Sequence, residues 1–353
     1  MNIAKKLGLE TETFSRMCVQ TKMLLSNILG HAAEVHYENY LRSISKTFKK
    51  APTDEHFDYI VDGNRDQVKR FETSGTNAKR VGINLTQTHG DRSAQDAFYE
   101  INSFDRLVAF DVGFENHATF RIKDIPRHSK YPNHLCASFK FDRENYALSE
   151  FQSKFLNAMK VKNEEFPNAI NSLINQNSWT YSVALEKFCG LDLGSIDELF
   201  SEENFRLITG AKGFAAEEHF NVLLEKEGIS YRQDKNMYSK VDHWLGNKRI
   251  QVKIPNQRAV TDTQWAFKTH KSHGSGVGEL YKVDSFDFVA LFIGYEIDES
   301  KDKYLPLRVS NSFIIVPIED IEQHPNHPGY LKRVTTFPKD KYKVNDLSLL
   351  TRN

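Results

Sequence analysis

Two short apolar runs, one in each half of the chain, give the first structural prediction. They are RLVAFDV at 106–112 and FVALFI at 288–293. A run of this length and composition, with polar residues on both sides, is typical of a strand that is buried on both faces. Both segments are therefore expected to lie inside a sheet.

The segments before the two runs follow one order in both halves. A helix is predicted first, over 30–41 and 213–224. A strand, a short turn and a second strand are then expected over 58–69 and 242–253. A polar loop and another helix should lead into the buried strand. This order predicts an α/β fold, with a mixed central sheet flanked by helices in each half.

The two halves also match residue by residue. GHAAEVHYENYL (30–41) and GFAAEEHFNVLL (213–224) share six identical residues at an offset of 183. DYIVDGNRDQVK (58–69) and DHWLGNKRIQVK (242–253) match at an offset of 184, and Tyr99 matches Tyr281 at 182. A nearly constant offset over roughly 100 residues predicts an internal duplication.

The copies differ in length near their ends. DIPRHSKYP (124–132) matches DIEQHPNHP (320–328) at an offset of 196, so the second copy has gained about 14 residues. We expect them in or near 295–311, as a loop or hairpin. The apolar spacing between the copies, with Pro167 in the first turn of a helix, predicts a helical bridge.

These boundaries define three expected parts. They are a first unit at 1–140, the helical bridge at 141–180, and a second unit at 181–353.

Composition and charge narrow the class of protein. Lys plus Arg and Asp plus Glu both number 47, and 39% of the residues are hydrophobic. A packed core is therefore expected, and a simple polycation is excluded, although a DNA-binding cleft is not. The three cysteines lie far apart, which argues against a zinc site or a disulfide framework. With no apolar run of about 18 residues, a soluble cytoplasmic protein without membrane contact is expected.

The repeated strand pair carries the candidate chemistry. In Gln-Val-Lys, the Gln and Lys side chains point to one face of the strand because side chains alternate. The Asp of the preceding strand should lie beside them. Carboxylate and amide oxygens suit Mg²⁺, and a nearby Lys can stabilise negative charge or orient water. The combination fits the hydrolysis of a phosphodiester.

This arrangement resembles the PD-(D/E)XK nuclease superfamily, over roughly 30–110 and 213–293. The residues that match its catalytic motif are Asp58, Gln67 and Lys69 in the first copy and Asp242, Gln251 and Lys253 in the second. Members often add a carboxylate from the preceding helix, which corresponds to Glu34 and Glu217. The resemblance implies that Mg²⁺ is held by the Asp, the Gln and this Glu in each copy.

The chain departs from the family pattern at two points. Neither Asp follows a Pro, and Gln stands at the second acidic position in both copies. A Gln-x-Lys at a strand edge is often only solvated surface, but its recurrence in both copies favours a site. His36 and His219 lie two residues beyond the Glu on the helix, a spacing that favours a role in packing rather than metal binding.

Candidate DNA contacts lie after each Lys. The segments 71–93 and 255–279 are rich in Arg, Lys, Asn, Gln and Thr, which contact phosphates and base edges. Within them, the pairs Thr88-His89 and Thr269-His270 match each other and are candidate DNA-binding residues. Such polar segments are also common in plain loops, and the sequence leaves both interpretations open.

The resemblance implies a Mg²⁺-dependent, sequence-specific endonuclease of the type II restriction class that acts on double-stranded DNA. The duplication would supply two active sites in one chain, so that a monomer acts as an intramolecular pseudodimer and each copy cuts one strand. Two alternatives stay open. One is a structure-specific repair or recombination nuclease, and the other is a DNA-binding protein without catalytic activity.

Overall fold

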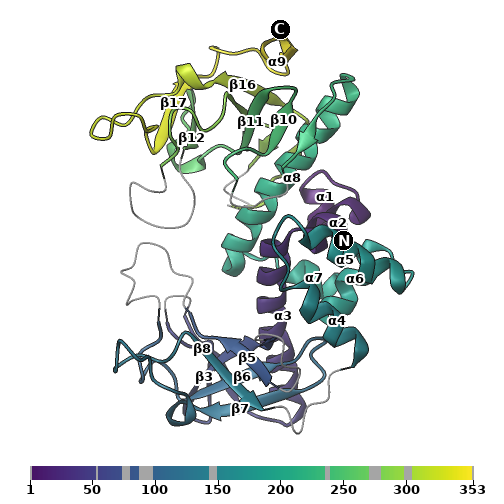
Figure 1. Ribbon diagram of the computed structural model, residues 1–353, viewed down its shortest axis with the longest axis vertical. Coiled ribbons are helices and arrows are strands. Elements are labelled where there is room, and N and C mark those ends of the chain that lie inside the picture. Colours follow the sequence, from purple (N-terminus) through teal and green to yellow (C-terminus); the bar gives the residue numbers. More distant parts are fainter. Residues whose placement is uncertain are drawn as a thin grey trace. The chain divides into compact units, whose positions relative to one another are not determined.

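A computed structural model of the chain contains two compact units, each with a mixed sheet flanked by helices (Figure 1). Unit 1 is Cys18–Asn204, and unit 2 is Asn2–Met17 together with Phe205–Asn353. The predicted α/β class with mixed sheets is confirmed. The structure describes residues 2–52, 55–73, 80–86, 98–142, 149–234, 239–269, 280–297 and 304–351.

The main sheet of unit 1 contains the predicted buried strand. Its order is β1 (Phe48–Lys50), β2 (Tyr59–Val61), β3 (Asn64–Arg70), β6 (Arg106–Phe110) and β7 (His117–Arg121). Strands β3 and β6 are parallel, and the other neighbours are antiparallel. The long helix α3 (Lys22–Ser43) lies against β3 (Figure 1).

The main sheet of unit 2 has the same order and the same strand directions. It consists of β9 (Arg232–Gln233), β10 (His243–Leu245), β11 (Lys248–Lys253), β13 (Phe288–Phe292) and β16 (Phe313–Pro317). Again only the third and fourth strands are parallel. The long helix α8 (Phe205–Lys226) lies against β11. Two halves with matching sequences therefore form units of the same topology.

A smaller set of strands covers the other face of each sheet. In unit 1 it is β4 (Glu72–Thr73), β5 (Arg80–Asn84) and β8 (Ser138–Asp142), and in unit 2 it is β12 (Gln264–Lys268) with β17 (Val334–Pro338). Leu107 of β6 and Val289 of β13 are buried in these two cores. The extra residues of the second copy form the predicted hairpin, β14 (Tyr295–Glu296) with β15 (Arg308–Val309).

The helices around the sheets follow the predicted pattern in part. Helices α4 (Glu150–Ala158) and α5 (Phe166–Gln176) lie in the segment predicted to be helical, with Pro167 in the first turn of α5, and both belong to unit 1. The described residues between β3 and β6 contain strands and no helix, although a helix was expected there.

The remaining elements are short. The helices are α1 (Asn2–Lys6), α2 (Thr11–Gln20), α6 (Tyr181–Cys189), α7 (Leu193–Glu198) and α9 (Ser348–Thr351), and the 3₁₀ turns are Ile122–Asp124, Glu202–Asn204, Gln257–Ala259 and Ile318–Asp320. No described helix combines the length and the apolar character that a membrane span requires.

The compact units differ from the predicted boundaries because the first segments of the two copies are exchanged. Residues 2–17, expected in the first unit, belong to unit 2, and residues 181–204, expected in the second, belong to unit 1. Each segment contacts the long helix of its unit through a hydrogen bond between a histidine and a backbone carbonyl. His219 Nε2 lies 2.8 Å from the carbonyl oxygen of Leu7, and His36 Nε2 lies 2.9 Å from that of Cys189.

Glycine allows this close contact. Gly8 and Gly190 follow these carbonyl groups and have positive φ angles of 71° and 62°. A Cβ at Gly8 would lie 3.1 Å from His219 Cε1, and one at Gly190 would lie 3.1 Å from His36 Nε2. Burial lowers the pKa of both histidines, which favours the neutral ring with a single N–H to donate. The matching histidines are therefore packing residues, as their spacing predicted.

A buried ion pair distinguishes unit 1. Asp66 on β3 is fully buried and accepts hydrogen bonds from Arg106 on β6, at 2.6 Å from Nε and 2.7 Å from Nη2. The Tyr37 hydroxyl of α3 donates to Asp66 Oδ2 at 2.5 Å. These bonds satisfy a carboxylate that would otherwise be costly to bury.

In unit 2 the same positions are apolar. Ile250 and Phe288 pair across β11 and β13 as Asp66 and Arg106 pair across β3 and β6. Phe220 on α8 corresponds to Tyr37 by the helix match. The whole polar cluster has thus been exchanged for hydrophobic side chains in one unit, with the strand pairing unchanged.

We predict that Arg106→Leu destabilises unit 1 by about 3–5 kcal/mol, because it leaves the Asp66 carboxylate buried without its cation. The triple variant Tyr37→Phe, Asp66→Ile, Arg106→Phe should recover most of this loss, since it installs the unit 2 cluster. Urea denaturation followed by circular dichroism measures both. A triple variant no more stable than the single variant would contradict this account of the two cores.

Candidate functional site

The aspartates occupy the same place in both units. Asp58 and Asp242 immediately precede β2 and β10, and were expected inside these strands. Their backbone N–H groups nevertheless continue the sheet pairing, since Asp58 donates to the carbonyl of Asp66 at 2.9 Å and Asp242 to that of Ile250 at 2.8 Å. Each Asp is thereby fixed beside the strand that carries the Gln and the Lys.

Each aspartate side chain is bound by the next strand. Asp58 Oδ2 accepts from the Val68 backbone N–H at 2.6 Å and from the Gln67 amide. Asp242 Oδ2 accepts from Val252 N–H at 2.7 Å and from the Gln251 amide. The structure therefore brings the predicted Asp and Gln into direct contact in both units.

Lys69 and Lys253 lie two residues beyond the Gln and are half-buried. Lys253 Nζ donates to the Tyr281 hydroxyl at 3.2 Å, and Lys69 Nζ lies 5.4 Å from the centre of the Tyr99 ring. Burial lowers the pKa of each Lys, but the Tyr and the neighbouring carboxylates raise it further, so that the net pKa is above the ordinary value. Both lysines are therefore cations.

Tyr99 and Tyr281 are functional candidates that the catalytic motif of the family does not include. Both are buried, with 5% and 3% of their surface exposed. Their match at an offset of 182 was the available signal. Only the structure shows that the two tyrosines contact the two lysines.

The helix glutamates lie near the aspartates, as the family resemblance implied. In unit 1, Glu34 of α3 is part-buried, and its charge raises the pKa of Asp58. In unit 2, burial and the charge of Asp242 raise the pKa of Glu217 of α8 well above its ordinary value. We refer to Glu34, Asp58, Gln67 and Lys69 as site 1, and to Glu217, Asp242, Gln251 and Lys253 as site 2.

Burial also shifts the aspartates themselves. It raises the pKa of Asp58 to about 7, with the Glu34 charge adding to the effect and Lys69 opposing it. It raises the pKa of Asp242 to about 6, with Lys253 again opposing. Two carboxyl groups held close together in a poorly solvated place favour a cation between them.

The donor set fits a hard divalent cation. Within the described residues, the hydrogen bonds to each Asp use Oδ2, which leaves Oδ1 for a ligand. Gln251 is 5% exposed, and its Oε1 is buried without a hydrogen-bond partner in the described part of the chain. The described residues contain no group of three His, Cys, Asp or Glu ligands, so each site offers two carboxylates and one amide. Such oxygen donors suit Mg²⁺ with several waters.

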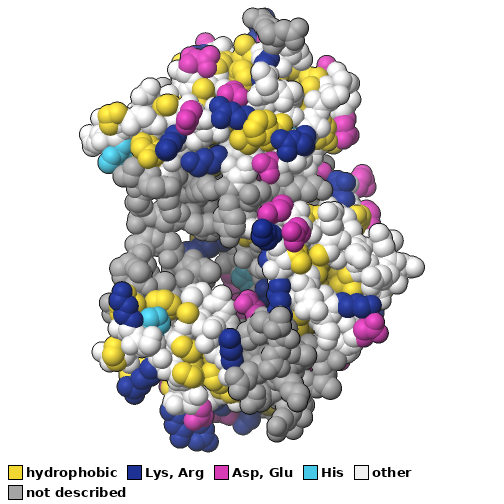
Figure 2. Space-filling model, in the orientation of Figure 1, with side chains coloured by type: hydrophobic (Ala, Val, Ile, Leu, Met, Phe, Trp, Pro, Cys, Tyr) yellow, Lys and Arg dark blue, Asp and Glu magenta, His cyan; other side chains and the backbone are white. Residues whose placement is uncertain are grey.

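The predicted DNA-binding residues are only partly described. Thr88, His89 and His270 lie outside the described residues. Thr269 is fully buried, and its hydroxyl donates to the carbonyl of Lys332. A DNA contact by Thr269 stays a prediction that this orientation does not favour. On the face that Figure 2 shows, acidic and basic side chains of the described residues are interspersed, in keeping with a net charge of zero.

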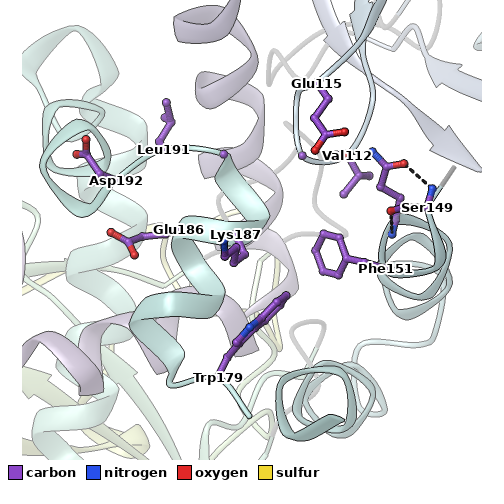
Figure 3. Close-up of a pocket in the computed structure, with 12 residues that line it drawn as sticks. Val112, Glu115, Ser149, Phe151, Trp179, Glu186, Lys187, Leu191 and Asp192 are labelled. Atoms are coloured by element: carbon purple, nitrogen blue, oxygen red, sulfur yellow. Dashed lines mark hydrogen bonds between the residues drawn. The ribbon is translucent and has the colours of Figure 1, made fainter. Parts of the chain in front are cut away.

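A cavity of 620 Å³ in unit 1 is distinct from site 1 (Figure 3). Phe151 and Trp179 line it, and their rings pack edge to face at 5.5 Å. Two of its carboxylates have structural partners, because Glu186 accepts from Leu193 N–H and Asp192 from Ser195 N–H. None of the residues of site 1 lines this cavity.

We predict that in EDTA the contribution of Asp58 and Asp242 to the stability of the folded protein falls as the pH rises from about 4 to 7. A carboxyl whose pKa is raised by folding binds its proton more tightly in the native state, so its contribution is greatest below the unfolded pKa and is lost through the folded one. Asp58→Asn should flatten this dependence up to about pH 7, and Asp242→Asn up to about pH 6.

Urea denaturation at a series of pH values provides the measurement. Asp124→Asn, which changes an exposed aspartate, serves as the control. A pH dependence identical in the wild type and in both site variants would show that these aspartates are not perturbed by burial.

Comparison with known proteins adds little to this geometry. No family model matches the chain, and no curated protein matches it. Among solved structures, it is similar to a bacterial homing endonuclease at 15% identity with a TM-score of 0.26, over 34% of this chain and 80% of that one. A likeness of that size supports no conclusion about fold or function.

Proposed function

We propose that the chain is a Mg²⁺-dependent endonuclease that cuts double-stranded DNA, with PD-(D/E)XK nuclease units that form an intramolecular pseudodimer. The observation that carries this proposal is the Asp–Gln–Lys–Tyr arrangement, held by the same hydrogen bonds in two units of equal topology. Two diverged copies keep this arrangement while the buried cluster around Asp66 has changed to apolar residues.

Each group has a distinct role in the proposed reaction. Asp Oδ1, the Gln amide oxygen and the helix Glu would hold Mg²⁺, which supplies a water of lowered pKa and neutralises phosphate charge. The Lys ammonium stabilises the negative charge that develops on the phosphate, and the Tyr hydroxyl fixes the position of Lys Nζ. The hydrogen bonds to Asp Oδ2 hold the carboxylate in place for these steps.

The substitution of Gln for an acid removes one negative charge from each strand. It favours weaker metal binding than three carboxylates would give, and it is the feature that supports a DNA-binding protein without catalysis. Retention of a cationic Lys at both sites favours catalysis, because Lys contributes to the transition state rather than to metal binding. Catalysis is therefore the proposal that these residues support better.

The metal requirement is tested with supercoiled plasmid DNA. Mg²⁺ should support cutting, EDTA should abolish it, and Ca²⁺ should support binding without cutting, because its larger and looser coordination positions water poorly. Sequencing the cut ends distinguishes a recurring target sequence from cuts at branched or single-stranded DNA. Efficient cutting in EDTA would refute the metal mechanism, and binding without cutting in Mg²⁺ would support the non-catalytic alternative.

The division of labour gives a second test. We expect Lys69→Ala and Lys253→Ala each to slow the cutting of one strand, and of opposite strands, by at least about 100-fold. Each variant should accumulate open-circular plasmid, and the double variant should bind without cutting. End labels specific to each strand identify the nick.

Lys46→Ala is the matched control, because Lys46 is exposed and pairs with Asp62. If one variant cuts both strands normally, that unit is not an active site. If each single variant abolishes all cutting, the two sites do not act independently.

A further inference from the structure

The two sites have equivalent ligands but different charged neighbours. In unit 1, Lys50 Nζ lies 3.8 Å from Glu34 Oε2, at the end of β1. Lys50 also lies 3.4 Å from Glu203, which is exposed. A cation thus stands next to a carboxylate of site 1, where it opposes the binding of a second cation.

The strand pairing identifies the corresponding residues of unit 2. Lys50 pairs with Tyr59 across β1 and β2, and Gln233 pairs with His243 across β9 and β10. In unit 2, Gln233 hydrogen-bonds to Glu217, and in unit 1, Lys50 contacts Glu34. Gln233 and Lys50 therefore occupy equivalent places beside the helix glutamates. The neighbouring backbone bonds agree, since Ala51 N–H donates to the Asp58 carbonyl and Asp234 N–H to the Asp242 carbonyl.

Two substitutions therefore make the surroundings of site 2 more negative. Gln233 replaces the cation Lys50, and Asp234 replaces Ala51. The Asp234 charge acts on Asp242 and raises its pKa.

A further carboxylate near site 2, Glu218, is balanced by Arg16 at 2.9 Å. At site 1, the charge of Lys50 is offset by Glu203 when that exposed residue is counted. At site 2, Arg16 offsets Glu218, and Asp234 remains. The neighbours of site 2 therefore carry at least one more negative charge than those of site 1. The ligands themselves are the same.

We propose that site 2 binds a divalent cation more tightly than site 1, and that residues 50, 51, 233 and 234 set the difference. The inference rests on the proposed function, because it assumes that the two sites are metal sites. The buried Oε1 of Gln251, beside Asp242 and without a partner in the described residues, independently points to a ligand at site 2. At limiting Mg²⁺, unit 2 cuts its strand first and nicked DNA accumulates.

The size of the effect follows from Coulomb's law. One unit charge about 7 Å from a divalent ion changes its affinity about tenfold in a water-like dielectric, and less at high salt. Two classes of site that differ by about tenfold or more in Kd are therefore expected in low salt. Raising the ionic strength should bring the two values closer together.

The test measures Mn²⁺ binding without DNA, by calorimetry and by electron paramagnetic resonance of free Mn²⁺. Asp242→Asn should remove the tighter class, and Asp58→Asn the weaker. Lys50→Gln with Ala51→Asp should strengthen the weaker class about tenfold or more, and Gln233→Lys with Asp234→Ala should weaken the tighter one. Lys46→Gln makes the same charge change as Lys50→Gln alone, at an exposed residue outside both sites, and should leave both classes unchanged.

The outcomes separate this inference from the proposed function. Two equal classes, a tighter site in unit 1, or exchange variants that bind like the wild type would overturn the inference while the metal sites stand. The absence of Mn²⁺ binding that depends on Asp58 and Asp242 would refute the metal sites themselves. If a paired exchange perturbs folding, Lys50→Gln alone provides the same test, because its side chain is exposed.

Discussion

The hydrogen bonds to Asp58 and Asp242 are the interaction on which the rest of the proposed site depends. A backbone N–H of the next strand and the Gln amide hold one oxygen of each carboxylate. These bonds join β2 to β3 in unit 1 and β10 to β11 in unit 2, at the residues that carry the Gln and the Lys. Burial raises the pKa of each aspartate although the backbone hydrogen bond lowers it, and a buried carboxylate favours a nearby cation. Fold and candidate chemistry thus share one structural element.

The exchanged segments make each unit depend on the other half of the chain. Residues 2–17 complete unit 2 and residues 181–204 lie in unit 1, each through a histidine on the long helix and a glycine of positive φ. Each unit therefore contains sequence from both halves of the chain.

The two units differ in two ways that have a physical explanation. The core around Asp66, Arg106 and Tyr37 has been exchanged as a complete cluster, because a partial exchange would leave a buried charge unpaired. The surroundings of the sites differ at single residues, as at Lys50 and Gln233, where the difference in charge changes the local electrostatic field. The Glu, Asp, Gln and Lys of the two sites are the same residue types.

The sequence by itself determined the buried strands β6 and β13, the strand pairs that precede them, the helices at 150–176 and the Asp, Gln and Lys candidates. These features follow from local periodicity and from spacing that recurs in both copies. The tertiary structure alone decided that Tyr99 and Tyr281 contact the lysines, and that Lys50 stands beside Glu34. It also decided which unit each exchanged segment completes. The segments that contain Gly8 and Gly190 are alike, and so are the helices that carry His36 and His219. The local sequence therefore allows each segment to pack against either helix, and only the path of the whole chain selects the helix that it contacts.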